Sequence, residues 1–309
     1  MLSVGALEDP ETRQIGAAMI EFTKTDARIS ETLLTNCIFW VQSLPDDELG
    51  PSRRVLEDLE VLQGGFPVFV RRVSNRDEMV ATLTEIARLA EQDGYRPVLH
   101  LDCHGSAEQG LLLAPSGERL DWAETVDLLR RINVATRNNL VCVFALCFGL
   151  HAYTQVALKR PVPAYLFAGP ESEIEVGFLE DETLAFYRRM IETNNVTLAF
   201  KETLGGKMVS VHCQGLFLQA LLSYIRQFAK GKARRTRLER LVTEVLKNDG
   251  DIHPSPDRLK QIRADIRRVL EPGQALIDRY EPSFLIGRKA AFTYADIEAI
   301  LSGNARPKA

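Results

Sequence analysis

Short apolar runs alternate with amphipathic stretches through the first two thirds of the chain. Runs at 66–73, 97–102 and 140–146 have the length and side-chain content of strands, and the last is apolar throughout, as in a strand covered on both faces. Between these runs the apolar positions recur at the spacing of one helix face. Alternation of strand and helix is typical of a sheet with helices on both sides. The pattern therefore predicts an α/β fold, a three-layer α/β/α sandwich with a mostly parallel sheet.

Polar residues mark where two of the helices begin. Ser74 with Asp77 precedes one apolar stripe, which runs up to Gly94, and Asp121 with Glu124 precedes another. A short acceptor side chain followed by an acidic residue three positions later is a common start signal, and glycine is a common stop. The two stripes are Met79, Leu83, Ile86 and Leu89, and Trp122, Val126, Leu129 and Ile132.

The remaining segments of this region are assigned in the same way. The run at 162–169 predicts another strand and 179–192 another helix, and 110–120 predicts a hairpin that turns at a Ser-Gly pair. Residues 31–41 fit either a strand or a short helix. The acidic stretch 43–60 contains two prolines and is interpreted as an exposed connection.

After about residue 198 the pattern becomes helical. We therefore predict a sheet-containing domain over 1–198 and a helical C-terminal region over 199–309. The final segment carries a complete capping box, formed by Thr293 and Asp296. The other predicted helices of this region lie at 214–228, 236–247 and 257–270.

Composition limits the choice of partner and compartment. The 309 residues include 45% hydrophobic and 26% charged side chains, with a formal net charge of −4, as in an ordinary globular protein. No apolar stretch is long enough to cross a bilayer, and the first residues lack the features of a signal peptide. We therefore expect a cytoplasmic protein without membrane association. The negative net charge argues against whole-protein attraction to nucleic acid.

One segment has the opposite charge. Residues 226–240 contain seven basic side chains and one acid, so they could contact nucleic acid or an acidic partner. Apart from Phe228, the segment lacks the aromatic side chains that stack on single-stranded bases. We favour a solvated junction between helices.

The five cysteines are spaced irregularly and include no CxxC pair. An odd number in a chain without an export signal indicates reduced thiols, and any reactive thiol would act singly. Cys103 and Cys142 lie within predicted strands, where alternation and burial predict a packing role.

The candidate chemistry lies where two strands end. The apolar run at 97–102 leads into His104 and Gly105, and the run at 140–146 leads into Cys147. If the two strands are neighbours, the imidazole and the thiol meet at one edge of the sheet. The backbone N–H groups of a helix starting near Gly149 would favour the thiolate form of the cysteine, and the imidazole could carry protons. The N–H groups of Gly105 and Cys147 could stabilise an oxyanion, which completes the groups needed for acyl transfer.

These residues resemble the caspase-like cysteine peptidases, which include caspases, metacaspases and CHAT-domain proteases. The matching features are His104-Gly105 after the VLHLD strand, the sequence ALCFG at 145–149 after the LVCVF strand, and the glycine-centred hairpin at 110–120. The order of the later strand and helix also matches. The resemblance covers roughly residues 30–195. It implies that Cys147 is the nucleophile, that His104 is the catalytic base or acid, and that Gly105 is an oxyanion donor.

The chain departs from these families at two places. Caspases have glutamine immediately before Ala-Cys and metacaspases have aspartate two residues before the cysteine, whereas this chain has Ala145-Leu146. Neither substrate preference can therefore be transferred. The connection LKRPVP at 158–163 is also too short to contain a long cleavable linker. We infer activation by a partner protein or ligand rather than by self-cleavage at this connection.

Two further groups have alternative interpretations. Glu171 and Glu173 follow the strand at 162–169, where a carboxylate could bind a basic substrate side chain, although a solvated acidic loop is the simpler interpretation. Cys147, His104 and His151 could supply three zinc ligands, but no fourth ligand is evident, so we predict neither a metal nor a cofactor.

The sequence therefore predicts a cysteine endopeptidase that cleaves a protein or peptide substrate with a His104–Cys147 dyad. The resemblance suggests a regulated proteolytic effector, for example in bacterial antiviral defence or cell death. The alternative is a catalytically silent caspase-like scaffold that binds a protein partner through its helical region.

Overall fold

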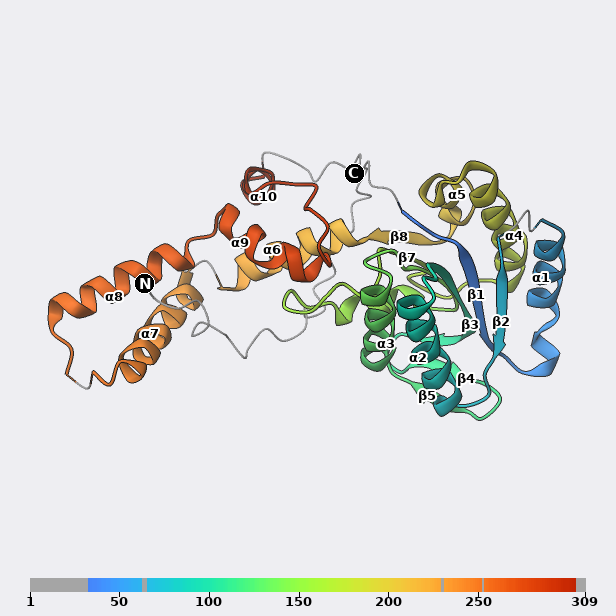
Figure 1. The fold of residues 1–309 in the computed structure, drawn as a ribbon, viewed down its shortest axis with the longest axis horizontal. Coiled ribbons are helices and arrows are strands. Elements are labelled where there is room, and N and C mark those ends of the chain that lie inside the picture. Colours follow the sequence, from blue (N-terminus) through green and yellow to red (C-terminus); the bar gives the residue numbers. More distant parts are fainter. Residues whose placement is uncertain (1–32, 63–65, 229–230, 252, 304–309) are drawn as a thin grey trace.

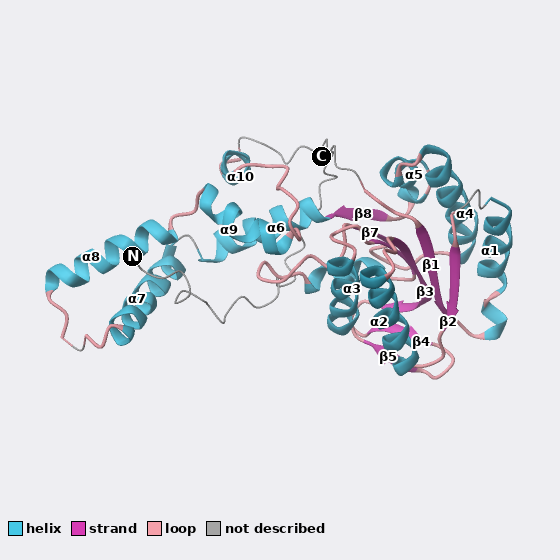
Figure 2. Cartoon of the chain, viewed as in Figure 1, coloured by secondary structure: helices cyan, strands magenta, loops and turns pink. Residues whose placement is uncertain are grey.

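The structure, a computed structural model, describes residues 33–62, 66–228, 231–251 and 253–303. Its centre is a mixed, mostly parallel sheet with the strand order β2-β1-β3-β6-β7-β8 (Figures 1 and 2). The hairpin strands β4 and β5 extend from β3. The strands are β1 (Cys37–Ser43), β2 (Val68–Arg72), β3 (Pro97–Ser106), β4 (Gly110–Leu113), β5 (Glu118–Leu120), β6 (Val141–Ala145), β7 (Leu166–Gly169) and β8 (Val209–His212).

Helices cover both faces of this sheet (Figure 1). Helices α2 (Arg76–Gln92) and α3 (Trp122–Ala135) pack side by side on one face, and α1 (Gly50–Leu62) and α4 (Val176–Thr193) pack together on the other. A central parallel strand must therefore be apolar on both sides, which explains why every residue of β6 is buried. The predicted α/β fold with a mostly parallel sheet is confirmed.

The sequence signals locate most of these elements. Residues 31–41, which were ambiguous, contain the start of β1, and the predicted hairpin is β4 and β5. Asp121 caps α3 by accepting a hydrogen bond from the backbone N–H of Glu124. Helix α2 is capped by Asn75 in the same manner, one residue after the predicted position.

One local prediction is wrong, and another is right only in its starting position. The stretch 43–60 is not an exposed connection, because it contains the short 3₁₀ helix η2 (Asp46–Glu48) and most of α1. Pro51 fits the first turn of α1, where its missing N–H is not needed, and Val55 and Leu59 bury the inner face. The helix expected near Gly149 begins at that residue, but it is a seven-residue 3₁₀ helix, η3 (Gly149–Gln155), and not an α-helix.

The C-terminal part divides into two packing units. Helices α6 (Cys213–Phe228) and α9 (Gln274–Phe284) share the core of the sheet domain, and the rings of Phe217 and Phe284 stack with their centroids 5.0 Å apart. Helices α7 (Gly231–Asn248) and α8 (Pro256–Leu270) form a hairpin with its own apolar cluster and project away from the sheet (Figure 1).

The remaining elements connect these units. Helix α10 (Tyr294–Leu301) begins with the predicted capping box of Thr293 and Asp296. Helix α5 (Val196–Glu202) and the 3₁₀ helix η4 (Leu204–Gly206) lead into β8, which pairs antiparallel with β7. The domain boundary at residue 198 stays a prediction, and the last strand of the sheet lies beyond it. No helix in the described ranges has both the length and the apolarity needed to cross a bilayer.

Candidate functional site

His104 and Cys147 come from neighbouring strands that end at the same edge of the sheet. Strands β3 and β6 are parallel, with Asp102 opposite Ala145. Each site residue lies two positions beyond this pair, His104 still on β3 and Cys147 in the turn that follows β6. The side chains of Asp102, Ala145, His104 and Cys147 all line the same pocket, which residues of α1 and α4 close from the other side.

Gly105 brings the two strand ends into close contact. A Cβ atom at this position would lie 2.1 Å from the backbone oxygen of Cys147 and 2.5 Å from Cδ1 of Leu146. No side chain larger than hydrogen fits there without displacing the backbone that carries Cys147. The glycine in the sequence is therefore required by the close approach of the two chain segments.

The backbone after Cys147 makes a tight turn that is fixed by the loop following β7. Phe148 adopts a left-handed conformation with φ 58° and donates its N–H to the carbonyl of Ser172 over 3.0 Å. Leu150 donates to the carbonyl of Pro170 over 3.1 Å. Within the part of the chain that the structure describes, the backbone N–H of Cys147 forms no hydrogen bond.

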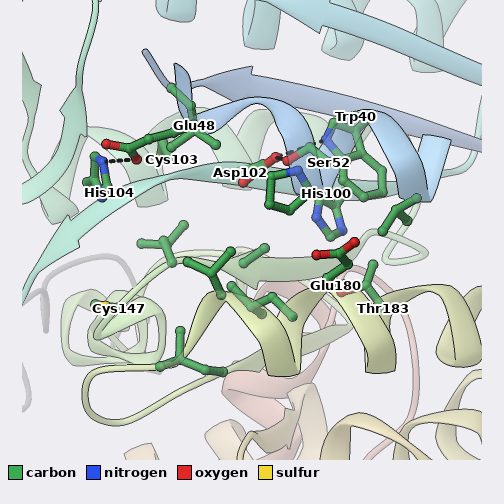
Figure 3. Close-up of a pocket in the computed structure, with 18 of the residues that line it drawn as sticks. Trp40, Glu48, Ser52, His100, Asp102, Cys103, His104, Cys147, Glu180 and Thr183 are labelled. Atoms are coloured by element: carbon green, nitrogen blue, oxygen red, sulfur yellow. Dashed lines mark hydrogen bonds and ion pairs between the residues drawn. The ribbon is translucent and has the colours of Figure 1, made fainter. Parts of the chain in front are cut away.

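Both side chains line one pocket between the sheet and the helices α1 and α4 (Figure 3). Its volume is about 300 Å³, at the lower end of the range found for ligand pockets. We use two names for its parts. The rim comprises Glu48, His104 and Cys147, and the floor comprises Trp40, Ser52, His100 and Asp102.

At the rim, His104 is held by a carboxylate. Its Nε2 lies 2.8 Å from Oε2 of Glu48, and both side chains are 46% exposed. Among the described residues, no hydrogen bond joins the imidazole to the Cys147 thiol, and Nδ1 of the ring is not hydrogen-bonded. Figure 3 shows the two residues at the same end of the pocket, His104 on β3 and Cys147 in the loop after β6.

On the floor, Asp102 is 7% exposed and has two hydrogen-bond donors. The hydroxyl of Ser52 and the indole Nε1 of Trp40, the latter at 3.4 Å, both donate to its Oδ2. Burial raises the pKa of the Asp102 carboxyl, although these two hydrogen bonds and the charge of His104 act in the opposite direction.

His100 forms the inner end of the floor. Its ring stacks on Trp40 with a centroid separation of 3.6 Å, and its Nδ1 lies 3.0 Å from the hydroxyl of Tyr187 on α4. The side chain is 1% exposed, and burial lowers the pKa of its imidazole to about 3. His100 is therefore neutral near pH 7.

The other cysteines have different surroundings from Cys147. Cys37, Cys103, Cys142 and Cys213 are buried, which confirms the packing role predicted for Cys103 and Cys142, whereas Cys147 is partly exposed. Burial raises the pKa of Cys37 to about 12 and raises that of Cys103 and Cys142 as well.

The two predicted substrate-binding glutamates lie outside the pocket lining. Glu171 and Glu173 are exposed in the loop after β7, next to Ile174, which does line the pocket. Their predicted role stays a prediction. His151 lies on η3 and packs its ring edge-on against Phe148, with centroids 5.9 Å apart. In the described ranges no group of three or more His, Cys, Asp or Glu side chains is arranged to hold a metal ion.

Sequence reasoning missed several residues of the pocket. Glu48 and Ser52 lie in the stretch that was interpreted as a connection, so no signal pointed to them. Asp102 and His100 share the period-two face of β3 with His104, and this alternation could have identified them.

No protein-family model matches the chain, and no curated protein is significantly similar to it in sequence. The chemistry of the pocket is therefore interpreted from its own geometry.

Proposed function

We propose that this protein is a cysteine endopeptidase of the caspase-like type, with Cys147 as the nucleophile and His104 as the proton carrier. The observation that supports the proposal best is the position of both side chains at the rim of one pocket, although 43 residues separate them in sequence. The sheet with helices on both faces is compatible with the caspase-like α/β/α sandwich that the sequence suggests. The partial exposure of Cys147 leaves its sulfur accessible to a peptide.

In the first step the thiolate of Cys147 attacks the carbonyl carbon of the scissile peptide bond. The C–N bond then breaks, His104 gives a proton to the leaving amine, and a thioester forms on Cys147. The free backbone N–H of Cys147 is available to stabilise the oxyanion of the tetrahedral intermediate, and we assign Gly105 as the second donor. In the second step His104 takes a proton from water, which attacks the thioester and releases the acid.

The contact between Glu48 and His104 suits this role. If Nε2–H donates to Glu48, the lone pair of the imidazole is on Nδ1, the nitrogen without a hydrogen bond in the described structure. Glu48 would then act as a positioning residue that selects the reactive tautomer. A hydrogen bond between Nδ1 and the thiol requires a rearrangement of the rim, which is consistent with activation by a partner protein or ligand.

The setting of this activity follows from the resemblance alone. We propose a cytoplasmic, regulated effector that cleaves a protein substrate, for instance in bacterial antiviral defence or cell death. The α7–α8 hairpin, which has its own apolar cluster, is the part of the helical region best separated from the catalytic pocket. It is therefore the part most suited to contact an activating partner.

The proposal is tested with the full chain and a mixed peptide library, with cleavage products identified by mass spectrometry. Cys147→Ala and His104→Ala should each abolish cleavage. The matched controls are Cys142→Ala and His151→Ala, because these residues lie within five positions of Cys147 in sequence but do not line the pocket. Both controls should retain cleavage.

Cleavage that survives Cys147→Ala or His104→Ala contradicts the dyad. If no peptide is cleaved and no peptide electrophile modifies Cys147, even with a bound activator, the scaffold alternative replaces the peptidase.

A further inference from the structure

The pocket lining has an unbalanced charge. Its acidic members are Asp47, Glu48, Asp102 and Glu180, and none of its lining residues is lysine or arginine. A small enclosed space with this composition attracts cations and repels anions, because its low-dielectric walls concentrate the field of the carboxylates.

Two of the four carboxylates already have a cationic or ionisable partner. Glu48 contacts His104, and Glu180 on α4 forms a paired contact with Arg54 of α1, in which Nη2 lies 2.8 Å from Oε2. The side chains of both pairs are partly exposed to solvent.

Asp102 differs because it is buried and, within the described ranges, forms no ion pair, so the charge of His104 acts on it only from a distance. Both of its donors, Ser52 and Trp40, are neutral, and both bind Oδ2. In the described ranges no lysine or arginine forms an ion pair with Asp102, and its Oδ1 has no hydrogen bond. The carboxyl belongs to the pocket lining, so this oxygen is available to a ligand in the pocket.

A buried carboxylate without a positive partner is unfavourable, and the raised pKa of Asp102 reflects this. Two neutral donors reduce the unfavourable energy but do not neutralise the charge. A ligand that brings a cation to Oδ1 would form a charge-assisted hydrogen bond in a site shielded from water. The pocket is therefore complementary to a positive group.

The rest of the lining suits the stem of a long side chain. Apolar side chains surround the path from the rim to the floor, which matches the hydrocarbon part of lysine or arginine. They include Leu44, Val55, Leu146, Ile174, Val176 and Leu179. Asp102 lies two residues before His104 on β3, a separation of roughly 6.6 Å along the strand, which a long side chain can bridge.

We propose that this pocket binds the cationic side chain of a lysine or arginine immediately on the amino side of the cleaved bond, with Asp102 as the residue that recognises it. This inference rests on the proposed peptidase function and assigns its substrate class. Asp102 is a specificity-determining residue, because it contacts the substrate side chain and not the reacting atoms.

The same geometry disfavours the other substrate classes. An aspartate or glutamate side chain would be repelled by the four carboxylates. An apolar side chain would cover Asp102 and leave its charge without water or a partner, which is costly in a buried site. A short polar side chain would not reach the floor from the rim.

The first experiment measures binding without chemistry. Agmatine, which carries the guanidinium and stem of arginine, is titrated into the full-length protein by isothermal titration calorimetry. Isoamyl alcohol is the neutral comparison. We expect agmatine to bind at least about tenfold more tightly, and we expect Asp102→Asn to remove this difference.

The second experiment measures recognition during the reaction. Peptide acyloxymethyl ketones that differ only in the residue next to the reactive carbonyl (lysine, arginine, norleucine or aspartate) compete for modification of Cys147, followed by mass spectrometry. In the wild type the lysine or arginine probe should react about thirtyfold faster than the norleucine probe, as expected for one charge-assisted hydrogen bond. The readout is a ratio within one protein, so a general change in reactivity cancels.

Substitutions of single acidic residues show which carboxylate recognises the cationic side chain of the probe. Asp102→Asn should lower the ratio toward one, because asparagine can keep an acceptor for Ser52 and Trp40 but carries no charge. Glu171→Gln and Glu173→Gln remove carboxylates outside the pocket lining and should leave the ratio unchanged. If these variants lower the ratio instead, recognition belongs to the loop after β7 and the assignment of Asp102 is wrong.

The outcomes separate the two proposals. Modification of Cys147 at equal rates by all four probes, or fastest by the aspartate probe, overturns the cation pocket and leaves the peptidase intact. Agmatine binding that depends on Asp102, without modification of Cys147 by any probe, supports the pocket and contradicts the peptidase. Absence of both overturns both.

Discussion

The rim and the floor of the pocket contain the same residue types in opposite environments. His100 and His104 lie on the same face of β3, yet His100 is 1% exposed, stacked on Trp40 and neutral, whereas His104 is half exposed and contacts Glu48. The difference arises from what covers each residue. Helix α4 places Tyr187 against His100, while the sheet edge leaves His104 open.

The carboxylates differ in the same way. Glu48 at the rim is paired with a histidine and is solvated, whereas Asp102 on the floor is buried with neutral donors only. A residue type therefore does not define a role in this pocket. In the proposed mechanism the solvent-accessible rim carries out proton transfer and nucleophilic attack, and the buried floor recognises charge.

The largest expected effect concerns the reactivity of the thiols. Iodoacetamide at pH 8 should modify Cys147 in the native protein at least about a thousandfold faster than Cys37, because each unit of raised pKa reduces the thiolate fraction tenfold. Peptide mapping by mass spectrometry measures the rates, and the unfolded protein, in which all five cysteines react, is the control. Comparable rates at Cys103 and Cys147 would show that the rim is not selectively accessible.

The next effect concerns the close approach at the rim. Gly105→Ala forces a methyl group into the backbone of Cys147 and should slow cleavage, or modification of Cys147 by a peptide electrophile, by on the order of 100-fold. Gly177→Ala in α4 is the matched control, because a Cβ there meets no atom within 4 Å. If both variants react at the wild-type rate, the backbone contact between β3 and Cys147 is absent.

A smaller effect arises from the floor and depends on pH. The folded-state pKa of His100, about 3, is below its unfolded value, so unfolding takes up a proton between pH 6.5 and 3 and the stability due to neutral His100 is lost as the pH falls. Between pH 7.5 and 5 this group should lower the free energy of unfolding by about 2 kcal/mol.

Denaturant unfolding of the wild type and of His100→Gln at both pH values measures this difference. Contributions from Asp102 and His212 are common to both proteins, so the variant should lose about 2 kcal/mol less on acidification. Equal losses would mean that His100 is protonated in the folded protein.

The smallest effect concerns the ion pair at the rim. Glu48→Ala should lower kcat/KM by about two- to fivefold, because a half-exposed pair contributes little and water can replace the carboxylate. Glu48→Gln, which keeps an acceptor for Nε2, should recover part of this loss. If the two variants behave identically, Glu48 acts through its charge and not by fixing the tautomer.

Local patterns predicted the strand ends of the rim but not the helix beside them. The strands β3 and β6 were evident from apolar runs, and the rule that parallel strands end at one edge was enough to place His104 near Cys147. Helix α1 was missed because Pro51 and the acidic flank obscured a stripe with few apolar residues. Glu48 and Ser52 were missed with it.

The floor depends on long-range contacts that no local pattern contains. Trp40, His100 and Tyr187 come from β1, β3 and α4, and their stacking results from tertiary packing. The burial of Asp102 also requires the covering helices. By contrast, the capping box at Thr293 was predicted correctly because all of its atoms belong to four consecutive residues.

The mass of the covalent intermediate tests most directly the central claim, that Cys147 is the nucleophile and His104 carries the proton. An intact peptide that the protein is known to cleave is mixed with it, and the reaction is quenched in acid within milliseconds. The modified residue is then mapped by mass spectrometry. We predict a thioester on Cys147 whose added mass equals that of the amino-terminal product less one water, and its loss in His104→Ala. An acyl group on another residue, or cleavage that persists in Cys147→Ala without such an adduct, would contradict the account.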